Sequence, residues 1–104
     1  MKVLYISGPY RSKEGNAGVM QNIMNAWKIT LDVWKKGEWV PLCPHLNSFM
    51  MDGVDTDDRF LEGDLELLRR CDGILMTPGW ENSEGAKAEL KHAHDLGLET
   101  IYQF

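Results

Sequence analysis

Hydrophobic and polar positions along the chain form two patterns, short apolar runs and longer stretches with helical spacing. The apolar runs predict β-strands at Lys2–Ser7, Glu38–Cys43, Asp72–Thr77 and Glu99–Phe104. Apolar residues three and four positions apart predict helices at Asn16–Lys36, Arg59–Arg70 and Glu84–Leu96. The strand that begins at Asp72 is apolar almost throughout, which is typical of a strand buried on both faces.

The alternation of strands and helices predicts a single α/β domain over residues 1–104. Helices between successive strands favour a parallel sheet with right-handed crossovers, as in Rossmann-like or flavodoxin-like three-layer sandwiches. Pro41 lies within the second strand, and proline cannot donate to a central ladder, so it indicates either an edge strand or the end of the strand. We therefore expect four parallel strands in the order 2-1-3-4, with a ligand site at their carboxyl ends.

The turn before the last helix is rich in small and capping residues. Ser83 is expected to cap the first helical turn, and Gly97 is expected to end the helix. Gly79, Ser83 and Gly85 flank the strand-to-helix junction, where free N–H groups and the positive end of a helix attract anions. This turn is therefore a candidate phosphate site.

Glu89 lies beside the apolar stripe of that helix, which is formed by Ala86, Leu90 and Ala93. One interpretation is that Glu89 reaches the surface and pairs with Lys91, Lys87 or a loop amide, because glutamate is mostly exposed. The other is that the carboxylate points inward for a functional reason, because burying an unpaired charge is costly. The neighbouring anion site favours the second interpretation.

Asp64 is a second carboxylate on an inward helical stripe, four residues after Phe60 and four before Leu68. It is either a site residue or a structural aspartate that binds loop amides. Asp57 or Asp58 is expected to cap this helix.

Polar residues also follow the first two strands. Ser7, Gly8 and Pro9 end the first strand, and His45 follows the second within a long loop at Pro44–Asp58. Long loops in compact domains are usually functional or mobile. His45 is equally well interpreted as a substrate contact or as a loop histidine with a structural partner.

The first helix has a wide apolar surface. Met20, Met24, Trp27 and Trp34 repeat at helical spacing, and Val19, Ala26, Ile29 and Val33 extend the apolar surface around the helix. This surface either packs entirely on the sheet or contacts a second subunit in part.

Composition narrows the function classes. The chain has 104 residues, 43% hydrophobic and 26% charged, which excludes a disordered or fibrous protein. A net charge of −5 disfavours nucleic-acid polymers and anionic membranes as partners, so we expect a small-molecule ligand. No transmembrane run or secretory signal is found, which predicts a soluble cytoplasmic protein.

The cysteines and histidines do not suggest a metal site. Cys43 and Cys71 lack zinc spacing, and His92 and His94 point to different faces of a helix. The arginines before Cys71 would lower the pKa of its thiol, whereas a buried cysteine usually behaves as inert packing. We expect neither a metal nor a cofactor.

Five segments resemble the nucleoside 2-deoxyribosyltransferase superfamily, in particular its short members in phages and bacteria. They are YISGPYRS (5–12), PLCPHLN (41–47), FLEGDLELLRRCDGIL (60–75), GWENSEGAKAEL (79–90) and LGLETIY (96–102). The combination of Tyr-x-x-Gly-Pro with Ser-x-Gly-x-x-x-Glu carries most of the resemblance. The superfamily includes nucleoside transferases and 2′-deoxynucleoside 5′-monophosphate N-glycosidases.

The resemblance implies roles for individual residues. Glu89 would be the nucleophile that forms a deoxyribosyl-enzyme intermediate, Asp64 would contact the sugar or assist the leaving base, and Tyr5 would position Glu89. Ser83 and Gly85 would bind a phosphate, with Arg11 as a helper. Members of the family form dimers or larger oligomers, which suits the wide apolar surface of the first helix.

The sequence therefore predicts cleavage or transfer of the N-glycosidic bond of a 2′-deoxynucleoside or its 5′-monophosphate. It leaves open whether water or a second base accepts the sugar. The alternatives are a non-catalytic nucleotide-binding module and an oligomerising accessory protein with a vestigial pocket.

Overall fold

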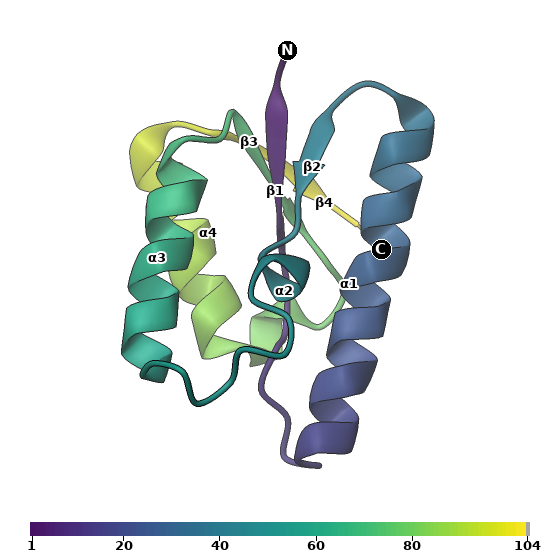
Figure 1. Cartoon of the computed structure of the whole chain (residues 1–104). Coiled ribbons are helices and arrows are strands. Elements are labelled where there is room, and N and C mark those ends of the chain that lie inside the picture. The colour runs from purple at the N-terminus through teal and green to yellow at the C-terminus, as the bar shows by residue number, and fades with distance from the viewer. Residues whose placement is uncertain (104) are drawn as a thin grey trace.

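The fold is a four-stranded parallel sheet, described here from a computed structural model over residues 1–103. The strands are β1 (Val3–Ser7), β2 (Val40–Leu42), β3 (Gly73–Met76) and β4 (Glu99–Tyr102). Their order is β2-β1-β3-β4, and each neighbouring pair is parallel. Both the order and the strand direction predicted from the sequence are confirmed (Figure 1).

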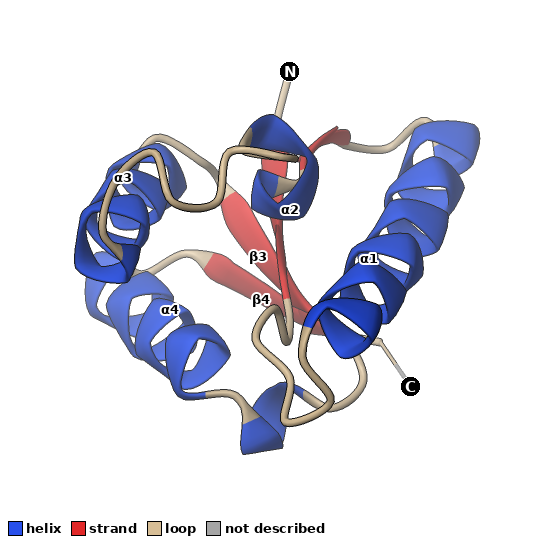
Figure 2. Cartoon of the chain, turned by 60° about the horizontal axis from the view of Figure 1, so that its bottom comes forward, coloured by secondary structure: helices blue, strands red, loops and turns tan. Residues whose placement is uncertain are grey.

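Helices cover both faces of the sheet, which gives three layers. Helix α1 (Asn16–Lys36) lies on one face, and α3 (Asp57–Arg69) and α4 (Glu84–Leu96) lie side by side on the other (Figure 2). The short helix α2 (Pro44–Asn47) contacts α1 and β1, and a 3₁₀ turn, η1 (Trp80–Asn82), precedes α4. Within residues 1–103, no helix is both apolar and long enough to span a bilayer.

Strand β1 contributes alternate residues to two separate cores. Tyr5 joins the core under α3 and α4, where it packs with Leu68, Met76 and Leu90. Leu4 and Ile6 join the core under α1. Because successive side chains of a strand point to opposite faces, one five-residue strand supplies both layers.

The predicted ends of α1 and α4 are confirmed. Ser83 has an extended backbone, and its Oγ accepts a hydrogen bond from the N–H of Ala86. Gly97 ends α4 at a φ of 73° and Gly37 follows α1 at a φ of 72°, in the left-handed region that glycine adopts with little strain.

Three local predictions were wrong. The second strand is three residues long, because Cys43 already precedes a new helix with Pro44 at its first turn. Part of the predicted loop at Pro44–Asp58 is thus helical. Thr56, and neither Asp57 nor Asp58, caps α3, because its Oγ accepts a hydrogen bond from the N–H of Arg59.

Two smaller differences concern the chain end and the turn before α4. Strand β4 ends at Tyr102, and the predicted last strand residue, Phe104, lies outside the described residues. The 3₁₀ turn at Trp80–Asn82 was not predicted.

Gly8 brings the ends of β1 and β3 close together. A Cβ atom built at Gly8 would lie 1.9 Å from Oγ1 of the buried Thr77, which directly follows β3. A larger residue at Gly8 would require the Thr77 side chain or one of the strand ends to move. This close approach fixes the carboxyl edge of the sheet, where the candidate site lies.

Candidate active site

A cavity of about 450 Å³ opens at the carboxyl end of β1, between α3, α4 and the segment that contains α2. Most of its lining residues carry polar or charged side chains, although most of the lining surface they expose is apolar. The lining residues are Gly8, Tyr10, Arg11, Pro44, His45, Ser48, Asp52, Asp57, Asp58, Phe60, Leu61, Asp64, Asn82, Ser83, Glu84, Gly85, Ala86 and Glu89.

Glu89 lies in the wall of this cavity and is only 7% exposed. Ser7 Oγ donates a hydrogen bond of 2.7 Å to Glu89 Oε1, and the hydroxyl of Tyr5 donates one of 2.5 Å to Oε2. The alternative of a surface ion pair is wrong, because Lys91 pairs with Asp95 instead. The inward orientation predicted for Glu89 is confirmed.

Burial raises the pKa of Glu89 to about 7, because the charged form is poorly solvated there. The hydrogen bonds from Tyr5 and Ser7 act in the opposite direction, and the charge of Asp64 adds to the rise. Burial and the charge of Glu89 hold the pKa of Tyr5 well above its usual range, so its hydroxyl stays a donor. The site therefore contains a carboxylate that gains and loses its proton near neutral pH.

Asp64 lines the same cavity from α3 and is half-buried. Burial raises the pKa of its carboxyl to about 6. Among the side-chain hydrogen bonds of residues 1–103, none joins Asp64 to a loop amide, so the purely structural interpretation finds no support there. Two carboxyl groups from adjacent helices thus face one cavity, an arrangement that can combine nucleophilic and acid–base chemistry on a glycosidic bond.

His45 is buried and lines the cavity. Its Nε2 lies 2.8 Å from the carbonyl oxygen of Pro9, which accepts a hydrogen bond, so we assign the proton to Nε2. Burial lowers the pKa of His45, which keeps the ring neutral. Nδ1 is a buried acceptor without a partner among the described residues. Both earlier interpretations of His45 are compatible with this position.

The predicted phosphate-binding residues line the cavity, but they already have partners. Arg11 contacts Asp57 at 2.5 Å and Asp52 at 3.7 Å. The Oγ of Ser83 accepts a hydrogen bond of 3.1 Å from the N–H of Ala86 and keeps its own O–H as a donor. Gly85 leaves open space, because a Cβ built there would have Ser83 Oγ as its nearest neighbour, at 4.0 Å.

Other predicted residues lie outside the cavity lining. Tyr5 and Ser7 lie behind Glu89 and contact the cavity only through it. Pro9 lines a separate hollow of about 260 Å³ against α1. Gly79 starts the 3₁₀ turn at a φ of 91° and lies next to Pro9. The structure thus brings together Gly8, Arg11, His45, Asp64, Ser83, Gly85 and Glu89 in one cavity.

Sequence reasoning missed a polar cluster at the cavity mouth. The hydroxyl of Tyr10 donates a hydrogen bond of 2.7 Å to Asp52, and both residues adjoin Arg11. These partners are more than 40 residues apart in the chain, so no local spacing could reveal them. The one available signal was the Tyr-x-x-Gly-Pro motif at residues 5–9. Tyr10 and Arg11 directly follow this motif and therefore lie just after the end of a strand.

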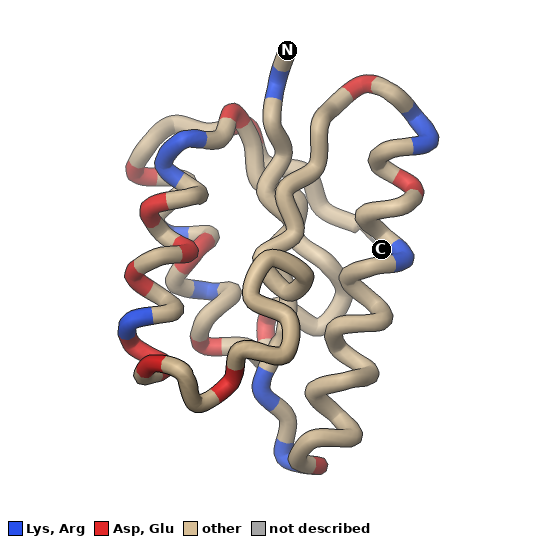
Figure 3. The backbone as a smooth tube through the Cα atoms, viewed as in Figure 1, with Lys and Arg blue, Asp and Glu red and all other residues tan. Residues whose placement is uncertain are grey.

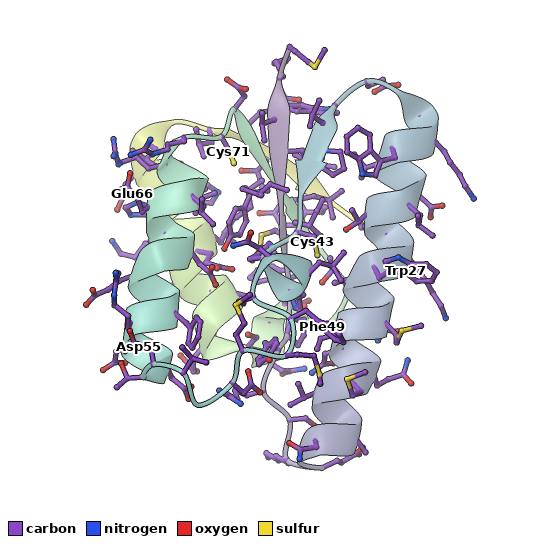
Figure 4. All side chains as sticks on the ribbon, in the orientation of Figure 1. Trp27, Cys43, Phe49, Asp55, Glu66 and Cys71 are labelled. Atoms are coloured by element: carbon purple, nitrogen blue, oxygen red, sulfur yellow. The ribbon has the colours of Figure 1, made fainter. Side chains whose placement is uncertain are left out.

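The cysteines do not contribute chemistry to this cavity. Cys71 is buried in the core under α4, and burial raises the pKa of its thiol to about 11, so the arginines before it do not activate it. Cys43 lies in the other core (Figure 4). No group of three or more potential metal ligands occurs in the part of the chain that the structure describes.

Comparison with known proteins places this geometry in context. A family model described as a domain of unknown function, DUF4406, matches residues 2–102. No curated protein matches the chain.

Two solved structures share the fold. One is a 2-desoxiribosyltransferase from Leishmania mexicana, with a TM-score of 0.59 and 24% identity; the match covers 98% of this chain and 63% of that one. The other is a 2-deoxyribosyltransferase from Bacillus psychrosaccharolyticus, with a TM-score of 0.64 and 15% identity, covering 96% and 70%. At these identities the likeness concerns the fold. The chain belongs to the DUF4406 family and shares its α/β fold with these two deoxyribosyltransferases.

Proposed function

We propose that this protein cleaves or transfers the N-glycosidic bond of a 2′-deoxynucleoside or its 5′-monophosphate. The observation that carries the proposal is Glu89, a buried carboxylate held by two hydroxyl donors in the wall of a 450 Å³ cavity. Pockets of this size accommodate small organic ligands. The fold shared with two deoxyribosyltransferases supports the same reaction class.

In the proposed mechanism, an ionised Glu89 oxygen attacks C1′ of the sugar. The C1′–N bond breaks, its electron pair leaves with the base, and a glycosyl ester forms on Glu89. Asp64, whose raised pKa favours the protonated form at mildly acidic pH, contacts the sugar hydroxyl or donates a proton to the base. Water or a second base then attacks C1′ and releases Glu89.

Other cavity residues have supporting roles in this proposal. Tyr5 and Ser7 orient the Glu89 carboxylate, and the neutral His45 ring forms part of the wall. Gly8, Arg11, Ser83 and Gly85 surround the space in which we place the 5′ end of the substrate. We propose no catalytic role for Pro9 or Gly79, which lie outside the cavity lining.

The assay for this proposal supplies each deoxynucleoside and deoxynucleoside 5′-monophosphate to the purified protein, with and without an acceptor base. Release of free base without an acceptor indicates a hydrolase, and base exchange only with an acceptor indicates a transferase. Binding of these ligands without turnover would instead support the alternative, a non-catalytic nucleotide-binding module. Absence of both binding and turnover would contradict the proposal.

We also propose that the protein forms a homodimer through α1. Met20, Met24, Trp27, Leu31 and Trp34 follow one another at alternating intervals of four and three residues. This is the spacing of a helix–helix seam, and Met20, Met24, Trp27 and Trp34 are 40–56% exposed although they are apolar. Figure 4 labels Trp27 on α1.

The dimer proposal is tested by sedimentation velocity. Wild-type protein should sediment as a dimer, and Trp34→Glu should shift it toward monomer because the charge would be buried in the seam. Asn25→Glu, at an exposed position of α1 outside the seam, is the matched control because it also adds one negative charge. A wild-type protein that remains monomeric at micromolar concentration would contradict this proposal.

A further inference from the structure

The charges around the cavity are strongly unbalanced. Six of the described lining residues carry carboxylates, and one, Arg11, carries a guanidinium; the carboxylates are Asp52, Asp57, Asp58, Asp64, Glu84 and Glu89. Figure 3 shows acidic residues gathered along α3 and the loop before it. A dianionic ligand group that enters this cavity meets an excess of like charge.

The one arginine is already neutralised. Arg11 contacts Asp57 at 2.5 Å and Asp52 at 3.7 Å, so two carboxylates surround a single guanidinium. Tyr10 holds Asp52 in place through its hydroxyl at 2.7 Å. A phosphate could pair with Arg11 only by displacing these carboxylates or by joining them at close range.

The N-terminus of α4 is partly satisfied by its own residues. Ser83 Oγ takes the N–H of Ala86, and the carboxylate of Glu84 lies in the first turn, where it pairs with Lys87 at 3.0 Å. Acidic side chains in the first turn interact favourably with the helix dipole and occupy the role that a bound anion would have. This end of the helix therefore offers less attraction to a phosphate than a free N-terminus does.

On the basis of the function proposed above, we propose that the cavity selects the uncharged 2′-deoxynucleoside over its 5′-monophosphate. Asp52 and Asp57 are the residues that determine this selectivity, because they neutralise Arg11 and add negative charge where the 5′ end lies. A 5′-hydroxyl can donate to either carboxylate or accept from Arg11, whereas a phosphate dianion can only accept.

The test compares kcat/KM for matched pairs of nucleoside and 5′-monophosphate. Wild type should prefer the nucleoside by at least about tenfold. Asp57→Asn and Asp52→Asn should each raise the monophosphate-to-nucleoside ratio about fivefold, the order expected when one unit charge is removed at cavity distance in partly screened surroundings. Added salt should lower the wild-type discrimination.

Glu62→Gln is the matched control, because Glu62 lies on the same helix as Asp57, is exposed and does not line the cavity. It removes the same charge and should leave the ratio at the wild-type value. Thermal unfolding of each variant checks that the fold is retained.

The outcomes separate this inference from the proposed function. A wild-type preference for the monophosphate, or equal shifts in Glu62→Gln and Asp57→Asn, would overturn the selectivity and leave the proposed reaction standing. Failure of wild type to bind or convert either ligand would overturn the proposed function, and the inference with it.

Discussion

The two faces of the sheet differ in what β1 places on them. On the α1 face, Leu4 and Ile6 pack with Ala26 and Val33 in an apolar core. On the α3 and α4 face, the same strand places Tyr5 and Ser7 against the buried carboxylate of Glu89. The α1 face buries only apolar side chains of β1, whereas the other face also buries the Glu89 carboxylate, which costs free energy.

This difference shows where the fold accepts the cost of a buried ionisable group. The hydroxyls of Tyr5 and Ser7 satisfy both Glu89 oxygens, yet the pKa of the acid remains raised to about 7. A side chain that served only packing would not need to be ionisable at this position. Strained or costly groups of this kind concentrate at functional sites.

The largest expected effect concerns the carboxylate itself. Glu89→Ala should lower kcat/KM by at least about 10³-fold, because it removes the nucleophile while leaving the cavity open to ligand. Ile6→Val, on the opposite face of the same sheet, should cost about 1 kcal/mol of stability and leave activity close to wild type. Comparable losses of activity in the two variants would erase the functional difference between the faces.

The second effect concerns stability and pH. The pKa of Glu89 is raised from 4.5 to about 7, so the folded protein holds a proton that the unfolded chain has lost. The free energy of unfolding should therefore fall as pH rises from about 4.5 to 7, by about 3 kcal/mol from this residue. Asp64 contributes in the same direction, with a pKa of about 6.

Denaturant unfolding across this pH range measures the effect. Glu89→Gln should remove most of the decline, because the amide does not ionise, and should make the protein more stable than wild type at pH 8. Glu62→Gln should retain the wild-type profile. A Glu89→Gln profile that matches wild type would show that the buried acid carries no such cost.

The smallest expected effect separates stability from ligand binding at two glycines. Gly85→Ala adds a methyl group that enters open cavity space, and Gly63→Ala adds one in the middle of α3 with no atom within 4 Å. Each should raise stability by up to about 1 kcal/mol, because alanine favours helix more than glycine does. Only Gly85→Ala should weaken nucleoside binding, as measured by calorimetry. Equal binding by both variants would remove Gly85 from the site.

Local sequence determined much of this protein. Apolar periodicity placed α1 and α4 at their observed bounds, because Gly37 and Gly97 end them and Ser83 caps the second. Pro41 has no N–H to donate to a neighbouring strand, and the strand that contains it lies at the edge of the sheet. The position of Glu89 beside an apolar stripe, taken together with the anion-binding turn before the helix, predicted its burial.

Tertiary structure decided the features that depend on contacts between distant segments. The sequence could not show that Arg11 is neutralised by Asp52 and Asp57, because these residues meet only when the loop after α2 folds over the end of β1. The family resemblance predicted that Tyr5 positions Glu89, but nothing in the sequence showed that Ser7, more than 80 residues away, binds the other oxygen of the same carboxylate. Helix ends are determined by residues that are close in sequence, whereas the charge and hydrogen bonding of the cavity depend on how distant segments pack around the sheet.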